Sequence, residues 1–363
     1  MKRAIPLLLI CSLCLTLLCA CGSPKTGAAP SGETVTFTDS AGREVEVPAE
    51  ITRVAPSGAV ATMFLASVCP EYMVCIASTP SSSQYKYLDA SLLRLPTTGQ
   101  LYGSKSTINL EALIGAGPQV IIDLGDAKDG IGRDMNALQK QTGIPVVFIE
   151  ADLPHMAEAF RMLGALLYGK TERCAELADY VDETVSLAAG NAARIPEGER
   201  ARVMYTSGVS GLNTNAAGST QAQVIDLVGA VNAVVVEDVS NKGGGNPINM
   251  EQLYVYDPDV ILFSTGSMYA DAKNDPAWSK VRAISEGRYY EIPALPYNWM
   301  SSPPSLNMLL GIRWLGNLLY PDVYDYDMAE EAQRAYSLLW SYALSDAEAA
   351  ELLAHSTLRE ASP

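Results

Sequence analysis

"INLEALIGAGPQVII" occupies Ile108–Ile122, and a related stretch, "INMEQLYVYDPDVIL", occupies Ile248–Leu262. Aligned without a gap, the two stretches are identical at seven of fifteen positions. Each predicts a helix with a glutamate in its first turn, then a turn at a proline, then a buried parallel strand. The same unit at the same place in two halves of the chain indicates two related lobes with a cleft between them.

Strands and helices alternate throughout both halves. In the first half, a short hairpin at residues 35–48 precedes apolar runs at Tyr72–Ser78, Gln119–Leu124 and Ile144–Glu150. In the second half, strands are expected at Ala201–Ser207, Asn232–Val239, Asp259–Thr265 and Arg288–Pro293. This alternation predicts an α/β fold of two Rossmann-like lobes with parallel sheets.

A long helical region separates the two halves. Its first helix has Asp152 as a candidate N-cap, apolar residues at helical spacing, and Gly169 as its stop. The second helix, from Thr171 to about Gly190, has an apolar stripe with steps of four and three residues. The stripe consists of Cys174, Ala178, Val181, Val185, Ala188 and Ala192. This pattern predicts one long rigid helix that joins the lobes.

The first residues have the pattern of a processing signal. Lys2 and Arg3 precede an apolar run at Ile5–Leu18, which is too short for a comfortable transmembrane helix. The stretch "LCAC", Leu18–Cys21, resembles a bacterial lipobox, in which Cys21 would receive diacylglycerol. The alternative is an ordinary signal that is cleaved nearby. The Gly-, Pro- and Ser-rich stretch that follows predicts a flexible tether.

These patterns divide the chain into six parts. They are a signal peptide (1–20), a lipoprotein tether (21–33), an N-terminal α/β lobe (34–151), linking helices (152–195), a C-terminal α/β lobe (196–327) and a helical tail (328–363).

Composition excludes several classes of function. The net charge is −16 and no basic run follows the first three residues, which argues against nucleic-acid binding. Two histidines and no CxxC in the mature chain make a protein-held metal improbable. Cys69 and Cys75 either form a disulfide or remain, like Cys174, buried free thiols. The stretch Gly208–Gly211 is one residue short of a nucleophile elbow and lacks a histidine base, so we predict no catalytic residue, cofactor or metal site.

Over about residues 35–325, the chain resembles the substrate-binding proteins of bacterial ABC importers for iron complexes and vitamin B12. The matching segments are the lipobox, Val35–Gly58, Thr107–Ile122, the linking helix, Gly218–Ala233, Ile248–Leu262 and Trp278–Pro293. The resemblance implies two lobes joined by one rigid helix. It also implies that Glu111 and Glu251, one per lobe, dock against arginines of the membrane permease, where charge pairing steers association.

The resemblance further implies partners and a location. The partners are a small-molecule metal chelate, an ABC permease with its ATPase, and the membrane through the lipid on Cys21, with the protein acting as a monomer on the outer face of the cytoplasmic membrane. Iron-siderophore complexes are the commonest cargo of such proteins, and corrinoid, haem, and molybdate or tungstate are the other candidates. A remote alternative is an exported hydrolase.

The ligand is expected at the carboxyl ends of the strands, in the crevice between the lobes. From the N-terminal lobe we nominate Ser57, Gly58, Tyr85, Tyr87, Tyr102 and Lys105. From the C-terminal lobe we nominate Ser207, Ser210, Asn213, Lys242, Gly244, Tyr297, Trp299 and Met300. Aromatic rings suit the face of a chelate, a glycine allows close approach of the backbone, and Met300 is an available haem ligand. Arg133 and Arg313 could each add a positive charge. The alternative is that these tyrosines are half-buried core residues and that the glycine run is only a loop.

Overall fold

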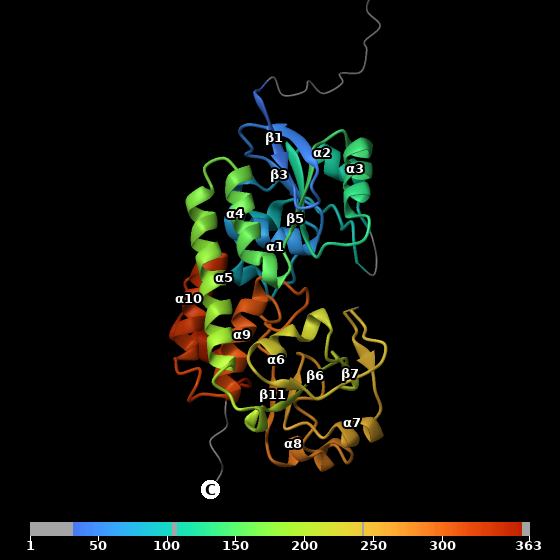
Figure 1. Cartoon of the computed structure of the whole chain (residues 1–363), viewed down its shortest axis with the longest axis vertical. Helices are drawn as coiled ribbons and strands as arrows, with labels where there is room; N and C mark the ends of the chain where they lie inside the picture. The colour runs from blue at the N-terminus through green and yellow to red at the C-terminus, as the bar shows by residue number, and fades with distance from the viewer. Residues whose placement is uncertain (1–31, 104–106, 242, 358–363) are drawn as a thin grey trace, which may run out of the picture.

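Two α/β lobes lie one above the other along the long axis of the molecule (Figure 1). The structure is a computed structural model that describes residues 32–103, 107–241 and 243–357. The lipobox with Cys21, together with Lys105 and Lys242, lies outside the described residues. In the described ranges, no helix combines the length and the apolar character that crossing a bilayer requires.

The N-terminal lobe consists of a hairpin, a small parallel sheet and helices. Its elements are β1 (Thr34–Thr38), β2 (Glu44–Pro48), β3 (Val54–Pro56), α1 (Ala59–Val68), α2 (Leu110–Ala116), β4 (Val120–Gly125), α3 (Ile131–Thr142) and β5 (Val146–Glu150). The sheet has the order β3-β4-β5, and all its pairs are parallel. Successive apolar residues of β4 enter clusters on opposite faces, which explains why the first five residues of the strand are all buried.

The predicted strand at Tyr72–Ser78 is wrong. Tyr72 belongs to a short 3-10 helix, and Met73 makes only an isolated bridge to Val54. Further along, the backbone of Ile76 pairs with the segment around Thr97 instead. The apolar run is therefore a buried connection whose neighbours change after each residue or two, which prevents a continuous ladder.

The C-terminal lobe has a mixed sheet. Its elements are β6 (Arg202–Ser207), β7 (Asn213–Thr214), α6 (Gln223–Leu227), β8 (Val231–Asn232), β9 (Asn246–Pro247), α7 (Met250–Tyr256), β10 (Val260–Phe263), α8 (Arg282–Ser285), β11 (Tyr289–Glu291) and α9 (Asn307–Leu319). Strands β8, β10 and β6 with β11 form its parallel part, whereas β7 and β9 run antiparallel to their neighbours. The strand expected over Asn232–Val239 is reduced to β8.

The internal repeat is confirmed as two copies of one structural unit. Helices α2 and α7 start at equivalent positions. The side chains of Asn109 and Asn249 cap them, each accepting a hydrogen bond from the backbone N–H of the third residue of its helix. Both helices end in a left-handed residue, Gly117 in one and Asp257 in the other. A proline and a buried parallel strand follow in each case.

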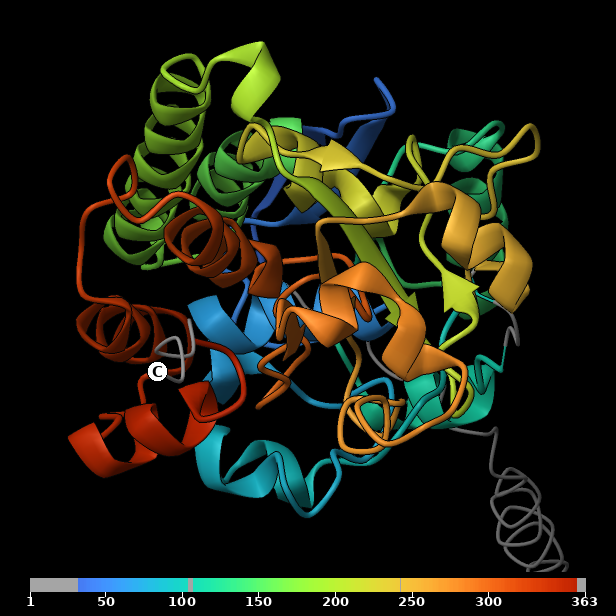
Figure 2. The same cartoon turned by 90° about the horizontal axis from the view of Figure 1, so that it is seen from below.

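Helices α4 (Met156–Leu166) and α5 (Thr171–Ala192) connect the lobes, and Asp152 caps the short turn before α4 as predicted. The C-terminal helix α10 (Met328–Trp340) lies on the same side of the molecule as α5 (Figure 1), and α11 (Asp346–Leu353) packs against α10 (Figure 2). One apolar cluster runs through both lobes and all these helices.

The C-terminal helices form a second connection between the lobes, which the sequence analysis did not predict. The ring of Tyr87, in the N-terminal lobe, lies 5.5 Å from that of Tyr336 and 5.1 Å from that of Tyr342. The ammonium of Lys86 lies 2.6 Å from the carboxylate of Glu348. The linking helix α5 is therefore not the only element that fixes one lobe against the other.

The three cysteines of the described chain are free and buried. The disulfide left open between Cys69 and Cys75 is not formed. Burial raises the pKa of the Cys69 thiol far above its usual range and that of Cys174 to about 12. These thiols therefore behave as small apolar side chains.

Candidate functional site

A cavity of about 990 Å³ lies between the two lobes. The N-terminal lobe contributes the carboxyl ends of β3 and β4 and the first turn of α1. The C-terminal lobe contributes the carboxyl end of β6, the glycine loop at residues 243–244, and the segment 294–304. Its position at the strand ends of both lobes agrees with the crevice expected for α/β sheets.

Six of the fourteen nominated ligand residues line this cavity. They are Ser57, Gly58, Tyr102, Ser207, Asn213 and Gly244. Ser57 and Gly58 directly follow β3, Ser207 ends β6, Asn213 begins β7, and the other two lie in loops. Their contact with a ligand stays a prediction, but the structure brings them together from both lobes.

Tyr85 and Ser210 are exposed and lie outside the cavity lining. Tyr87 is 4% exposed because it packs on the C-terminal helices. Tyr297 is half-buried beside Trp340 and lines a separate small pocket. These four side chains therefore face the protein or the solvent instead of the cavity, and their nominations are corrected.

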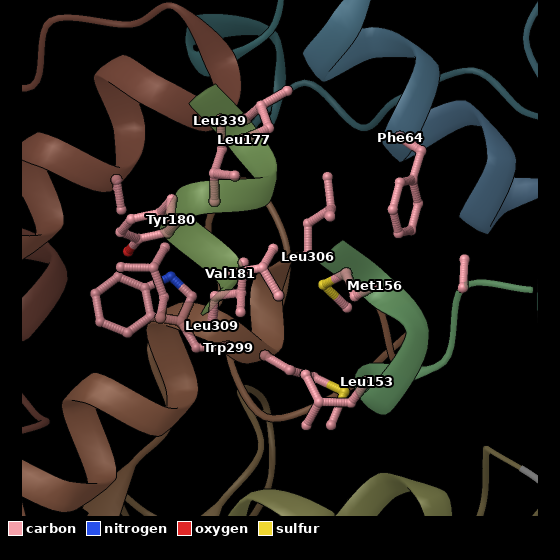
Figure 3. Packing of buried hydrophobic residues seen from close by; sticks show 14 of the residues in the cluster. Phe64, Leu153, Met156, Leu177, Tyr180, Val181, Trp299, Leu306, Leu309 and Leu339 are labelled. Atoms are coloured by element: carbon pink, nitrogen blue, oxygen red, sulfur yellow. The ribbon is translucent and has the colours of Figure 1, made fainter. Parts of the chain in front are cut away.

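The nominations of Trp299 and Met300 are also wrong. Both side chains are 0% exposed. Figure 3 shows Trp299 in the shared apolar cluster, close to Val181 of the linking helix and Leu309 of α9. The loop that carries them borders the cavity through Asn298 and the serine and proline residues that follow Met300, while the two large side chains point into the core. Met300 is therefore not a haem ligand in this structure.

Arg133 and Arg313 do not contribute charge to the cavity. Arg133 projects from α3 into solvent, with its side chain 82% exposed. The side chain of Arg313 is 3% exposed and pairs with Glu183 and Glu331 behind the cleft. Of the described residues that line the cavity, only Lys128 carries a positive charge.

The sequence analysis missed several polar residues of the lining, namely Gln100, Asp123, Asp126, Lys128, Asn215 and Gln221. Asp123 is the fourth residue of the apolar strand β4 and Asp126 directly follows that strand, and this interruption of the apolar run is the signal that could have identified them. Asn215 and Gln221 are 2% and 7% exposed, and each has a side-chain oxygen without a hydrogen-bond partner in the described structure. Such groups lie ready for donors on a ligand or on bound water.

Asp123 is the most deeply buried charged residue of the cavity, at 5% exposure. The hydroxyl of Ser57 donates a hydrogen bond to its Oδ1 atom. Burial raises the pKa of the Asp123 carboxyl, whereas the Ser57 hydrogen bond and the charge of Lys128 oppose that rise.

Tyr102 and Lys128 form a pair on the same wall. The ammonium of Lys128 lies 4.4 Å from the centre of the Tyr102 ring, as in a cation–π contact. The Tyr102 hydroxyl donates a 3.0 Å hydrogen bond to Asp134, and burial together with this bond raises the pKa of the phenol. The phenol is thus a hydrogen-bond donor to Asp134.

The first turn of α1 also borders the cavity, through Ala59, Val60 and Ala61. This helix has no acidic residue in its first turn and no side-chain cap. Its leading N–H groups and the positive end of the helix dipole therefore remain available to acceptor atoms.

The potential metal ligands among the described side chains of this cavity are mainly oxygen atoms, including those of Asp123 and Asp126. The described lining residues include no His, Cys or Met. Glu150, Asp152 and His155 are the one group in the described ranges with ligand atoms close enough to share an ion, and none of the three lines the cavity. The hydrogen bond with Asp152 raises the pKa of His155.

Glu111 and Glu251 are exposed in the first turns of α2 and α7. Neither forms an ion pair within the described residues. The two helices lie toward opposite ends of the long axis, one in each lobe (Figure 1). Both carboxylates are thus free to meet cations of another molecule.

Comparison with known proteins places the chain in a family. Residues 59–295 match the sequence profile of the periplasmic binding protein family, so the chain belongs to it. Proteins of this family are the solute-binding components of ABC transporters; they act outside the cytoplasm and are binding proteins rather than enzymes. The comparison with curated protein sequences found no match.

Solved structures with the same two-lobed architecture include several bacterial solute-binding proteins. An ABC transporter solute-binding protein from Sulfurospirillum deleyianum is 26% identical, with a TM-score of 0.80 over 88% of this chain and 99% of that one. A periplasmic solute-binding protein from Veillonella parvula is 24% identical, with a TM-score of 0.73 over 89% and 98%. A molybdate periplasmic binding protein from Haemophilus influenzae, bound to molybdate, is 19% identical, with a TM-score of 0.67 over 86% and 99%.

Proposed function

We propose that this chain is the extracytoplasmic substrate-binding lipoprotein of an ABC importer and that it captures a metal chelate of the ferric siderophore type. The observation that carries this proposal is the cavity of about 990 Å³ between the lobes, which is lined by hydroxyls, amides and backbone but offers no His, Cys or Met among its described lining residues. Such a lining can hold the oxygen-rich outer surface of a chelate while the chelator itself holds the metal.

The size and charge of the cavity limit the kinds of chelate that fit it. Its volume lies at the upper end of the roughly 300–1,000 Å³ that small-molecule sites occupy. Its described charges are two carboxylates and one ammonium, from Asp123, Asp126 and Lys128. A highly anionic complex, such as a tris-catecholate, would meet more negative than positive charge there. A neutral or cationic ferric hydroxamate is therefore the better match.

A second candidate is an oxyanion such as molybdate or tungstate. The uncapped first turn of α1 favours it, because helix N-termini bind anions. A tetrahedral oxyanion takes up only a few times the roughly 30 Å³ of one water molecule, so it would leave most of the cavity unfilled. The chelate is accordingly the first choice.

Delivery would use the two exposed glutamates. Glu111 and Glu251 would pair with cations on the permease and present the loaded protein in one orientation. The contacts of α5 and of the C-terminal helices would restrict the lobes to a small rocking motion. Cys21 would carry the lipid that holds the monomeric protein at the outer face of the cytoplasmic membrane.

The test is a ligand panel followed by transport. Thermal shift and native mass spectrometry of the purified chain should single out one of ferric hydroxamate, ferric catecholate, corrinoid, haem, molybdate or tungstate, because binding stabilises the folded state in proportion to the logarithm of ligand over Kd. Retention of affinity by the Glu111→Ala/Glu251→Ala double variant, with loss of uptake in cells, supports the docking role. Unchanged uptake would contradict that role, and no stabilisation by any member of the panel would contradict the choice of cargo.

A further inference from the structure

Asp123 lies where an apolar side chain would normally lie. It is the fourth residue of β4, on the same face as Ile121, whose side chain is fully buried in the sheet. Asp123 lies two residues further toward the carboxyl end, where the strand borders the cavity instead of the apolar core. Its carboxylate lines the cavity, and the residue is 5% exposed. A carboxylate in such a place is costly, since burial removes most of its hydration.

Hydrogen bonds within the protein replace only part of the hydration that this carboxylate loses. Within the described residues, the hydroxyl of Ser57 is the one hydrogen-bond donor to it, and that bond reaches Oδ1 alone. The Oδ2 atom has no partner there and keeps contact with the cavity instead of being sealed in the core.

Lys128, the one positively charged residue of the described lining, contacts groups other than Asp123. The Lys128 ammonium lies over the Tyr102 ring and donates to the backbone carbonyl of Asp126, 3.3 Å away. It does not come within ion-pair distance of Asp123, although its charge acts on that carboxyl from further off. The wall of the cavity on the side of the N-terminal lobe therefore presents the Asp123 carboxyl group without a cation paired to it in the described residues.

We propose that Asp123 is the residue that selects the solute, by pairing its Oδ2 atom with a positively charged group, an ammonium or a guanidinium, on the surface of the chelate. This inference rests on the proposed function and adds to it the chemical class of the cargo, a metal complex that carries a basic side arm. The same residue disfavours molybdate and other small oxyanions, which would bring a second negative charge against a buried carboxylate.

In a competing arrangement, Asp123 is the hydrogen-bond donor instead of the partner of a cation. If Asp123 were protonated in the complex, it would donate a hydrogen bond to an acceptor on the solute. The Asp123→Asn variant separates the two arrangements, because its amide can still donate but cannot pair with a cation. Asp129→Asn is the matched control, since it makes the same exchange at an exposed carboxylate outside the cavity lining.

The probes are a ferric trihydroxamate with a free primary amine and the same complex after N-acetylation, titrated calorimetrically into the full chain. We expect the amine complex to bind at least about tenfold more tightly, as for a charge-assisted hydrogen bond. Asp123→Asn should abolish that preference, whereas Asp129→Asn should keep it. The affinity for the amine complex should also fall as the pH is lowered and Asp123 becomes protonated.

Three results would overturn the inference. They are equal affinity for the two complexes in the wild-type protein, an undiminished preference in Asp123→Asn, and no binding of the amine complex. Binding of the acetylated complex as tightly as the amine complex would, in the same experiment, leave the solute-binding role intact while refuting the role of Asp123. Failure of the inference is therefore distinguishable from failure of the proposed function.

Discussion

Replacing Arg313 with alanine should destabilise the junction between the linking helix and the C-terminal helices. Arg313 belongs to α9, and its guanidinium contacts Glu183 of α5 and Glu331 of α10, each at 2.7 Å. Its Nε atom donates a 3.0 Å hydrogen bond to the Thr184 hydroxyl, and the group lies 5.1 Å from the centre of the Tyr180 ring. One side chain therefore ties three helices together.

The expected loss follows from what the substitution leaves behind. The side chain of Glu331 is 17% exposed and would lose its cation, whereas Glu183 would keep Arg334. Removing one partner of a buried ion pair costs about 3–5 kcal/mol, a large share of the roughly 5–15 kcal/mol by which a native protein is stable. Arg334→Ala is the matched control. Its side chain is 45% exposed and it pairs with the same Glu183, so its loss should stay below about 1 kcal/mol.

Urea unfolding, followed by far-ultraviolet circular dichroism and by tryptophan fluorescence, measures both variants. Coincident transitions would validate a two-state analysis, and an unchanged m-value would assign the shift in midpoint to stability. A double variant, Arg313→Met/Glu331→Leu, should recover most of the loss, because apolar residues of similar size can replace a buried ion pair. If Arg313→Ala and Arg334→Ala differed by less than about 1 kcal/mol, the desolvated network would not be the main contribution at this junction.

Three further outcomes are expected. Tyr87→Ala should lower the free energy of unfolding by about 3 kcal/mol, as for other buried aromatic residues, whereas the exposed Tyr85→Ala should change it by less than about 0.5 kcal/mol in the same urea assay. The arginine partners of Glu183 lower its pKa from 4.5 to about 2, so its contribution to the free energy of unfolding is complete above pH 4.5 and is lost as the pH falls toward 2. Glu183→Gln should flatten this part of a stability-versus-pH curve. The change should be under about 1 kcal/mol, because the Glu183 side chain is 46% exposed. The thiols of Cys69 and Cys174 should react with iodoacetamide only as fast as the protein unfolds, and rapid alkylation of the native protein would contradict their burial.

The features that the sequence predicted well depend on neighbouring residues. Asn109 and Asn249 cap their helices through their own first turns, and the prolines and apolar strands that follow are equally local signals. The long helix α5 was predictable for the same reason, because a single apolar stripe determines which of its faces is buried.

The features that were missed depend on distant contacts. Trp299 was interpreted as a surface for a chelate, but it is the packing of α5 and α9 around it that buries it. Tyr87 meets Tyr336 only because the last helices return to the first lobe, and nothing near either residue in the sequence indicates this. Asp123 was taken as part of an apolar strand, and its importance became visible only when the cavity placed it at the boundary between core and cleft.

The central claim is that the solute is held between the lobes, and filling that cavity tests it most directly. Gly244 lines the cavity, has open space around it, and has no left-handed backbone that a side chain would strain, so Gly244→Trp should fold normally. Gly190, exposed on α5 and equally unobstructed, provides the control variant Gly190→Trp. Calorimetric titration with the solute that the panel identifies should give one site in the wild type and in Gly190→Trp, and a loss of about a hundredfold or more, some 3 kcal/mol, in Gly244→Trp. Unchanged affinity in a folded Gly244→Trp would contradict the claim.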